Sequence, residues 1–292
     1  MSGTLLLPKG EGPFPAFILL HGSGPETRSA FTAKRYVRRF VAHGISVLHY
    51  DKRGAGKSSG DWMASDYYDL ARDAAAGIAL LARRDDIDSQ AIGIIGFSEG
   101  GWTGPLAATL SEHAALLITV SGPPMSPREQ GAFELEVELR GRGASPDAIS
   151  EAVALYHKRW NVLKSDEGWD ELDQAIAAAR TTSWYELAGR PERLDPANRR
   201  SQWYARVMDY DPVPALKSLE IPALMLYGAA DPVVDAKRSS NVIRELVDTE
   251  KKSFTVHIYP NVGHNLTTNG FSFPSDHWDR IFSWIAGQSP KQ

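Results

Sequence analysis

Residues 91–101 of the chain are Ala91-Ile92-Gly93-Ile94-Ile95-Gly96-Phe97-Ser98-Glu99-Gly100-Gly101. The first half of this stretch is short and apolar, which is typical of a buried strand. The residues that follow it, up to Leu110, are rich in Ala, Leu and Gly and indicate a packed helix. Ser98 therefore stands at a tight turn between a strand and a helix, and its glycine neighbours leave room for a strained backbone.

A serine in this setting is typical of a nucleophile elbow. The helix behind the turn would direct its free N–H groups at the point where negative charge develops in a reaction. The alternative interpretation is a glycine-rich turn with an incidental serine. A serine hydroxyl is a weak nucleophile unless a base accepts its proton and a third group orients the base. The nucleophile hypothesis therefore requires both partners elsewhere in the chain.

Asp231 and His264 are the candidates for those partners. Asp231 follows the apolar run 223–228, and His264 follows the apolar run 254–259. Taken alone, an aspartate before a proline is typical of a turn, and a single histidine is typical of a surface loop. Both residues, however, stand at the carboxyl ends of predicted strands, as Ser98 does. The order Ser, Asp, His is that of serine hydrolases built on parallel sheets, and it favours a triad of Ser98, Asp231 and His264.

The donors of an oxyanion hole are predicted near the start of the chain. The apolar run 16–20 precedes His21-Gly22-Ser23-Gly24. Acyl transfer requires preset hydrogen-bond donors, and the backbone N–H groups of Ser23 and Glu99 are the expected pair. His21 is expected to order its own loop, because the sequence offers no second ligand at metal-binding spacing. No metal site and no cofactor are expected.

Together these motifs resemble the α/β-hydrolase superfamily, and the resemblance runs nearly end to end. The Ser-Glu-Gly-Gly run at 98–101 and the segment Ser121-Gly122-Pro123 are similar to bacterial carboxylesterases and their serine-peptidase-like relatives. The resemblance implies a Ser-Asp-His esterase mechanism without a cofactor. A serine peptidase or an acyl thioesterase would use the same triad, and a non-catalytic ligand-binding homologue is the alternative from a different class. Phe97 departs from the family, which often has histidine before the nucleophile.

Short apolar runs alternate with amphipathic helical patterns along most of the chain. This alternation predicts an α/β fold with a mostly parallel twisted sheet flanked by helices. Strands are predicted at 17–20, 45–50, 91–95, 116–120, 223–227 and 254–259, and helices at 31–43, 66–84, 101–110, 236–247 and 277–286. One further short strand, 4–7, is expected at the edge of the sheet, where the family usually has a fuller hairpin.

The alternation stops between residues 125 and 211, where helix signals occur without a convincing strand. The prediction is a helical cap at 125–211, inserted into an α/β-hydrolase core made of residues 1–124 and 212–292. Because the insertion leaves and re-enters the core at strand ends, it is expected to cover the catalytic rim. The candidates for a substrate pocket are aromatic: Trp102, Trp160, Trp184 and Trp203. The alternative is that these tryptophans only hold small helices together.

Composition agrees with an ordinary enzyme and excludes several other classes. Of the 292 residues, 42% are hydrophobic, the formal net charge is −4, and there is no cysteine. No nucleic-acid partner and no membrane association are expected, because there is neither a basic stripe nor a membrane-spanning apolar run. The expected partner is a small-molecule ester substrate, the expected location is cytoplasmic, and a homodimer is left open.

The run Gly54-Ala55-Gly56-Lys57-Ser58 resembles the end of a phosphate-binding P-loop. A P-loop requires glycine five residues before Gly56, and Asp51 stands there. The glycines are therefore expected to form turns, with Asp51 and Arg53 bracing the loop.

Overall fold

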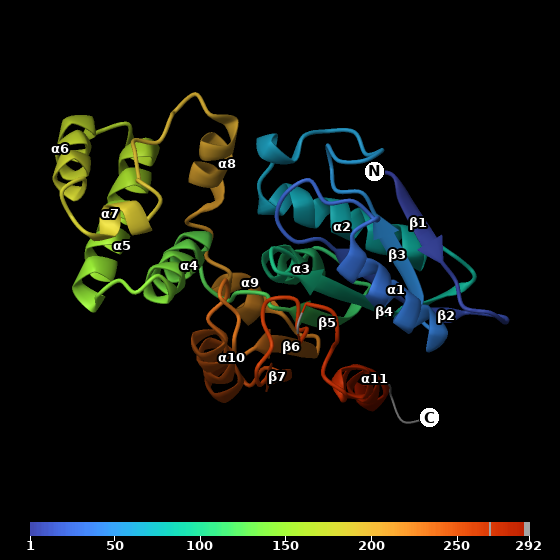
Figure 1. The fold of residues 1–292 in the computed structure, drawn as a ribbon. Helices are drawn as coiled ribbons and strands as arrows, with labels where there is room; N and C mark the ends of the chain where they lie inside the picture. The colour runs from blue at the N-terminus through green and yellow to red at the C-terminus, as the bar shows by residue number, and fades with distance from the viewer. Residues whose placement is uncertain (269, 289–292) are drawn as a thin grey trace. The chain divides into compact units, whose positions relative to one another are not determined.

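A computed structural model of the chain describes residues 1–268 and 270–288. The chain divides into two compact units (Figure 1). The first contains Met1–Pro124, Pro212–Asp231 and Ala236–Gln292, and the second contains Met125–Asp211 together with Pro232–Asp235.

The first unit is built on a single sheet in the order β1-β3-β2-β4-β5-β6-β7. Its strands are β1 (Gly3–Leu6), β2 (Phe14–Leu20), β3 (Ser46–Tyr50), β4 (Ile87–Phe97), β5 (Ala114–Val120), β6 (Ala223–Gly228) and β7 (Phe254–Tyr259). All neighbouring pairs are parallel except β1 and β3, which are antiparallel. The carboxyl ends of β2 to β7 therefore lie along one rim of the sheet.

The structure confirms the predicted strands, and the starts of β2 and β4 differ most from the prediction. β2 begins at Phe14, before Pro15, and the pairing of β2 with β4 changes register at Pro15. A strand tolerates proline at such an irregularity, so the strand extends past it. β4 begins at Ile87, because Ile87 pairs with Phe14 of β2. The pairing holds although polar residues follow Ile87 in the sequence. The expected short edge strand is β1, one residue earlier than predicted, and it forms no hairpin with β2.

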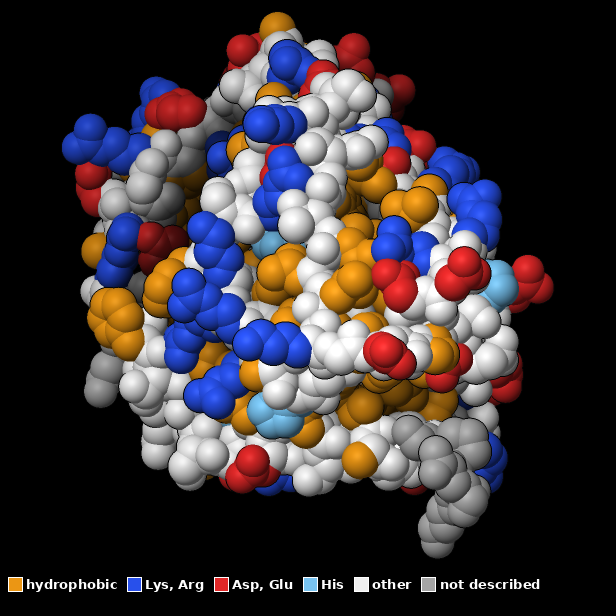
Figure 2. All heavy atoms as spheres, turned by 90° about the vertical axis from the view of Figure 1, so that its right-hand side faces the viewer, with side chains coloured by type: hydrophobic (Ala, Val, Ile, Leu, Met, Phe, Trp, Pro, Cys, Tyr) orange, Lys and Arg blue, Asp and Glu red, His pale blue; other side chains and the backbone are white. Residues whose placement is uncertain are grey.

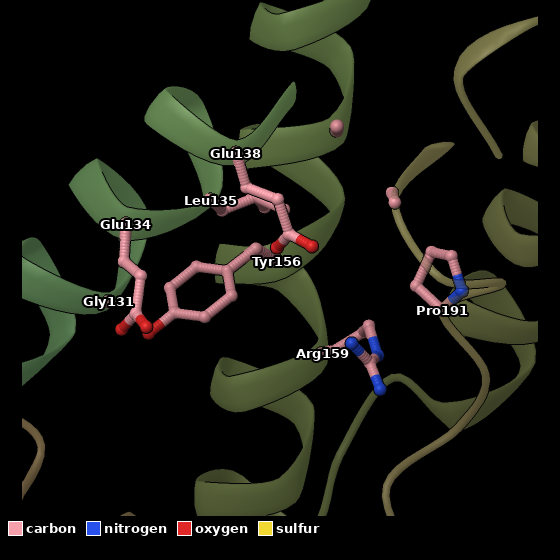
Figure 3. A pocket seen from close by; sticks show the side chains of 9 residues that line it. Gly131, Glu134, Leu135, Glu138, Tyr156, Arg159 and Pro191 are labelled. Carbon is pink, nitrogen blue, oxygen red and sulfur yellow. The ribbon is translucent and has the colours of Figure 1, made fainter. Parts of the chain in front are cut away.

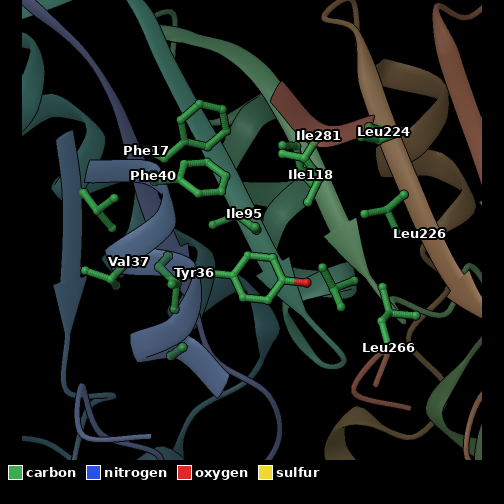
Figure 4. Packing of buried hydrophobic residues seen from close by; sticks show 14 of the residues in the cluster. Phe17, Tyr36, Val37, Phe40, Ile95, Ile118, Leu224, Leu226, Leu266 and Ile281 are labelled. Atoms are coloured by element: carbon green, nitrogen blue, oxygen red, sulfur yellow. The ribbon is translucent and has the colours of Figure 1, made fainter. Parts of the chain in front are cut away.

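Helices cover both faces of this sheet. On one face, α1 (Phe31–Ala42) and α11 (His277–Gln288) enclose a core that includes Phe17, Ile95 and Leu224 (Figure 4). The neighbouring Ile18 points to the other face, since side chains alternate along a strand, and there it lies under α2 (Tyr67–Ala82). The remaining helices of this unit are η1 (Trp62–Ala64), α3 (Gly100–Thr109), α9 (Val213–Ser218) and α10 (Ala236–Glu250).

The second unit is helical. Residues 125–211, all of which the structure describes, form α4 (Pro127–Gly141), α5 (Pro146–Ser165), α6 (Trp169–Ala179), α7 (Trp184–Leu187) and α8 (Arg199–Val207), and they contain no strand. Ser126 and Glu129 form a capping box at the start of α4. The buried core of this unit includes Leu139, Leu155 and Leu172.

The surface carries charges of both signs. On the face shown in Figure 2, a group of Lys and Arg side chains lies beside exposed hydrophobic side chains, and charges of both signs are mixed over the rest of the face. Within residues 1–268 and 270–288, no helix combines the length and apolar character needed to cross a membrane.

Candidate active site

Ser98 stands in a left-handed conformation between β4 and α3. Its φ is 49°, a value that non-glycine residues rarely adopt. Its N–H donates to the carbonyl of Val120 on the neighbouring strand at 2.9 Å. A Cβ on Gly96 would come within 2.2 Å of the carbonyl oxygen of Gly100, so only glycine permits the turn to close this tightly. The side chain of Ser98 is consequently held at the carboxyl rim of the sheet.

A second close approach fixes the start of α3. A Cβ on Gly101 would lie 2.2 Å from the Cα of Gly122, in the loop that follows β5. Next to Gly122, the hydroxyl of Ser121 donates to the carbonyl of His264 at 2.7 Å. The loop after β5 therefore contacts both the helix behind Ser98 and the loop that carries His264.

Asp231 and His264 meet although 33 residues separate them in the chain. Nδ1 of His264 lies 2.8 Å from Oδ2 of Asp231, and the Asp231 side chain is only 1% exposed. A Cβ on Gly228 would lie 2.4 Å from the carbonyl oxygen of Val262, so the two loops come into backbone contact. A neutral imidazole that donates from Nδ1 leaves Nε2 as its basic nitrogen.

Ser98 and His264 line one pocket of about 430 Å³ in the first unit, and Ser23 also lines it. Its apolar wall comes from β2, β4 and the start of α1: Leu19, Ala30, Phe31, Ala33 and Phe97. Phe31 is 66% exposed although it lines the pocket. Phe31 is not a predicted site residue, because the first residue of an amphipathic helix carries no signal that it faces a site.

The loop after β2 surrounds the predicted oxyanion position. Nε2 of His21 contacts the carbonyl of Tyr50, and Nδ1 lies 3.6 Å from Oε2 of Glu26. Glu26 also accepts the N–H of Gly22 at 3.0 Å. Burial acts to raise the pKa of Glu26, but the interactions with His21, the Gly22 N–H and Lys52 together outweigh burial, and the pKa is lowered. His21 thus orders its loop, as expected from the sequence.

The two predicted oxyanion donors differ in exposure. Ser23 is exposed at the pocket, whereas the Glu99 side chain is 1% exposed beneath it. In the part of the chain that the structure describes, the N–H groups of Ser23 and Glu99 donate to no protein acceptor. The N–H of Gly22, in contrast, is already bound by Glu26. Two N–H groups therefore remain for a ligand.

The glycine-rich loop after β3 is braced as predicted. Oδ2 of Asp51 accepts the N–H of Lys57 at 2.9 Å, and a Cβ on Gly56 would lie 2.5 Å from the same oxygen. Arg53 binds Asp73 through Nε and Nη2 at 2.6 and 2.7 Å. In these contacts the polar groups of the loop bind other groups of the protein. The contacts explain the glycines of the loop without requiring a bound phosphate.

The four candidate pocket tryptophans lie in different surroundings. Trp102 is buried in the first unit, stacks on Tyr67 and is not one of the residues that line the pocket described above. Trp184 is buried in the core of the second unit, where Nε1 donates to Glu151 at 2.8 Å. The other two, Trp160 and Trp203, also belong to the second unit, in which Trp160 packs against Tyr204.

The second unit has a pocket of its own, of about 200 Å³ (Figure 3). Tyr156 and Arg159 of α5 line it together with Glu134 and Glu138 of α4. Arg159 donates from Nε to the carbonyl of Glu192 at 2.6 Å. Its walls contain none of the four candidate tryptophans.

Comparison with known proteins identifies the family. Residues 17–283 match the sequence model of the Alpha/beta hydrolase family. The chain belongs to this family. The match confirms the predicted α/β-hydrolase fold, in which a mostly parallel sheet is flanked by helices.

The proteins similar to this chain are named for different activities. Esterase EstD of Thermotoga maritima is 24% identical over 95% of this chain and 61% of its own length, so the chain spans about three fifths of EstD. A non-heme haloperoxidase of Rhodococcus erythropolis is 25% identical over 78% of each chain. Among solved structures, DcsB in complex with its substrate analogue superposes with a TM-score of 0.63 at 19% identity, over 99% of this chain and 94% of DcsB. At this identity, the structural likeness shows the fold alone.

Proposed function

We propose that the chain is a serine hydrolase that cleaves carboxylic esters through an acyl-enzyme, with Ser98, Asp231 and His264 as its triad. The observation that carries the proposal is the hydrogen bond between His264 and Asp231 at the rim of a pocket that Ser98 and His264 both line. A nucleophile, a base and a group that orients the base are the elements that this chemistry needs.

The proposed reaction proceeds in two steps. Nε2 of His264 takes the proton of the Ser98 hydroxyl as Oγ attacks the ester carbonyl, and the N–H groups of Ser23 and Glu99 bind the oxyanion. The imidazolium then protonates the leaving alcohol, so that the acyl group remains on Oγ. Water, deprotonated by His264, attacks the acyl carbonyl, and the imidazolium then returns the proton to Oγ of Ser98 as the bond to Oγ breaks and the carboxylic acid leaves. Asp231 stabilises the imidazolium in both steps.

An ester is favoured over other acyl substrates on two grounds. The relative EstD is named as an esterase, and the Ser-Glu-Gly-Gly run resembles bacterial carboxylesterases. Part of the pocket wall beside Ser98 is apolar, and this part suits an uncharged acyl or alcohol group better than a charged one. Glu26 adds a carboxylate at this pocket, and its lowered pKa keeps it ionised at neutral pH, so anionic substrates are expected to be disfavoured.

The test is a panel of p-nitrophenyl esters, acyl thioesters and aminoacyl anilides against the pure protein, with Ser98→Ala as the matched variant. Ester hydrolysis that disappears in Ser98→Ala supports the proposal, as does covalent labelling of Ser98 by a fluorophosphonate. Preferred turnover of thioesters or anilides would replace the ester assignment with a thioesterase or peptidase. Absence of turnover and of labelling would favour a non-catalytic binding protein.

A further inference from the structure

A buried lysine lies beneath the proposed oxyanion hole, and the proposed mechanism does not use it. Lys52 is 4% exposed and follows β3. Its Nζ donates to the carbonyl of Gly22 at 2.5 Å and to Oε1 of Glu99 at 2.6 Å. Because a buried ion pair is often no more stabilising than an apolar pair of similar size, stability alone does not account for these contacts.

The first acceptor, the carbonyl of Gly22, belongs to the same peptide unit as the N–H of Ser23. The C=O and N–H of a trans peptide point in opposite directions across one rigid plane. When Lys52 holds the carbonyl on the inner side, the N–H of Ser23 must therefore point outward, on the side of the pocket that Ser23 lines. A hydrogen bond to a cation also polarises the peptide, which makes its N–H a stronger donor.

The second acceptor belongs to the residue that carries the other donor. The carboxylate of Glu99 is 1% exposed and binds Lys52, while the backbone N–H of Glu99 lies at the start of α3. Burial raises the pKa of Glu99, and the charge and hydrogen bond of Lys52 oppose that rise. One ammonium group thus contacts two segments that are 47 and 30 residues away from it in sequence.

The other contacts of the loop hold groups on either side of the Gly22–Ser23 peptide, so the orientation of this peptide depends on Lys52. Glu26 holds the N–H of Gly22, which belongs to the preceding peptide unit. The N–H of Lys52 donates to the carbonyl of Glu26 at 3.1 Å, so the backbone of Lys52 also supports the loop. Between these contacts, the Gly22–Ser23 peptide is flanked by the conformationally free Gly22 and Gly24, the latter with a φ of 90°.

We infer that Lys52 is a positioning residue that sets the orientation of the Ser23 oxyanion donor through the Gly22 carbonyl and, through the Glu99 carboxylate, links this peptide to the segment that carries the second donor. This inference rests on the proposed function, because it concerns donors that act only if an oxyanion forms. Without Lys52, the Gly22–Ser23 peptide is free to rotate and present its carbonyl to the pocket, where it would repel the oxyanion.

The test compares wild type with Lys52→Met/Glu99→Gln, which removes both buried charges together and so avoids leaving one unpaired. The measurements are kcat and KM for p-nitrophenyl acetate per fluorophosphonate-titrated site. They are accompanied by the affinities for a trifluoromethyl ketone, which binds as an oxyanion adduct, and for the matching methyl ketone. We expect kcat and trifluoromethyl ketone affinity to fall by roughly 10- to 100-fold, less than the ~10²–10³ of a fully lost donor. KM and methyl ketone affinity should stay within about threefold, as for an interaction made only in the transition state.

The matched control is Arg53→Met/Asp73→Asn, which removes a neighbouring ion pair that touches neither donor segment. It should leave kcat per titrated site unchanged. If the double variant of Lys52 and Glu99 does not fold, Lys52→Gln replaces it, because glutamine retains a donor for one of the two acceptors and should give a smaller loss of the same kind.

The outcomes separate this inference from the proposed function. An inactive Ser98→Ala together with unchanged kcat and trifluoromethyl ketone affinity in the Lys52 variants would overturn the inference alone. A fall in kcat without a fall in trifluoromethyl ketone affinity would also overturn it. Full activity in Ser98→Ala would instead remove the proposed function.

Discussion

Ser98 shows at the scale of one residue how the site depends on backbone geometry. The φ of 49° of this serine occurs in a turn so tight that a Cβ on Gly96 would lie 2.2 Å from the carbonyl oxygen of Gly100. A strained residue of this kind persists only where its surroundings determine it, and such residues are frequent at active sites. The hydroxyl is consequently presented at the rim without a flexible loop.

The triad predicts a particular ranking of single substitutions. Ser98→Ala and His264→Ala should each lower kcat by roughly 10⁶-fold, and Asp231→Asn by roughly 10⁴-fold, because nucleophile and base act as a unit while the aspartate orients the base. Steady-state kinetics on p-nitrophenyl acetate measures all three. The variant Ser98→Ala/His264→Ala should be no slower than either single variant, and additive losses would contradict a shared step.

Phe31 carries a second prediction at this scale. Since its ring lines the pocket while remaining 66% exposed, Phe31→Ala should change the preference among acyl chain lengths without a large loss of stability. The measurement is kcat/KM across esters from acetate to octanoate, with thermal unfolding as the companion. A control is Phe271→Ala, which truncates a ring that is 74% exposed and is not one of the residues lining this pocket. An unchanged profile in Phe31→Ala would place the acyl group elsewhere.

At the scale of elements, helix α3 meets the loop after β5 at a glycine contact. A Cβ on Gly101 would overlap the backbone of Gly122, whereas a Cβ on Gly104 of the same helix would meet the movable end of Leu117 at 3.2 Å. We expect Gly101→Ala to lower the free energy of unfolding by about 1–3 kcal/mol or more. Gly104→Ala should stay within about 1 kcal/mol of wild type, since the gain in helix propensity offsets the tighter contact. Urea denaturation of both variants checks the difference, and equal effects would contradict it.

Helix α11 begins at a buried histidine that predicts a pH dependence of stability. His277 is fully buried, stacks on Phe273 and binds the hydroxyl of Tyr36 at 2.9 Å. Burial lowers the pKa of His277 from 6.5 to about 3. Since the unfolded chain binds the proton more readily, the contribution of His277 to stability is fully present above pH 6.5 and is lost as the pH falls toward 3.

The size of this effect follows from the shift. Between pH 7.5 and pH 5, His277 alone should lower the free energy of unfolding by about 2 kcal/mol. The measurement is urea denaturation at both pH values for wild type and for His277→Gln, which keeps a polar partner for Tyr36 but does not titrate. The loss between the two pH values should be about 2 kcal/mol smaller in the variant, and equal losses would show that His277 is not responsible.

At the scale of the whole molecule, the chain consists of a sheet unit that contains the candidate triad and a helical unit that contains three of the candidate tryptophans. The prediction that the helical unit covers the catalytic rim remains a prediction. If it is right, Trp160→Ala should shift the acyl-length profile, because Trp160 is only partly buried. Trp184→Ala is the control, since Trp184 is buried in the core of its own unit and should affect stability instead. An unchanged profile in Trp160→Ala would leave the helical unit without a role in substrate selection.

What the sequence determined about this protein is its local structure. The short apolar runs, the amphipathic helical patterns and the glycines around Ser98 depend on residues close together in the chain. The parallel topology followed from the alternation of strands and helices, and it placed Ser98, Asp231 and His264 at the ends of parallel strands. The polar start of β4 escaped prediction because its pairing with Phe14 comes from a strand more than 70 residues earlier.

Only the tertiary structure decided which distant groups meet. The bond from Ser121 to the His264 carbonyl spans 143 residues, and the bond from Lys52 to Glu99 spans 47. The exposed ring of Phe31 likewise lines the pocket only because α1 packs against the sheet. Such contacts depend on strand order and on the path of each loop, which periodicity does not encode. A lysine after a strand is ordinarily a solvated side chain, and it becomes a buried partner of two loops only when β2, β3 and β4 lie side by side.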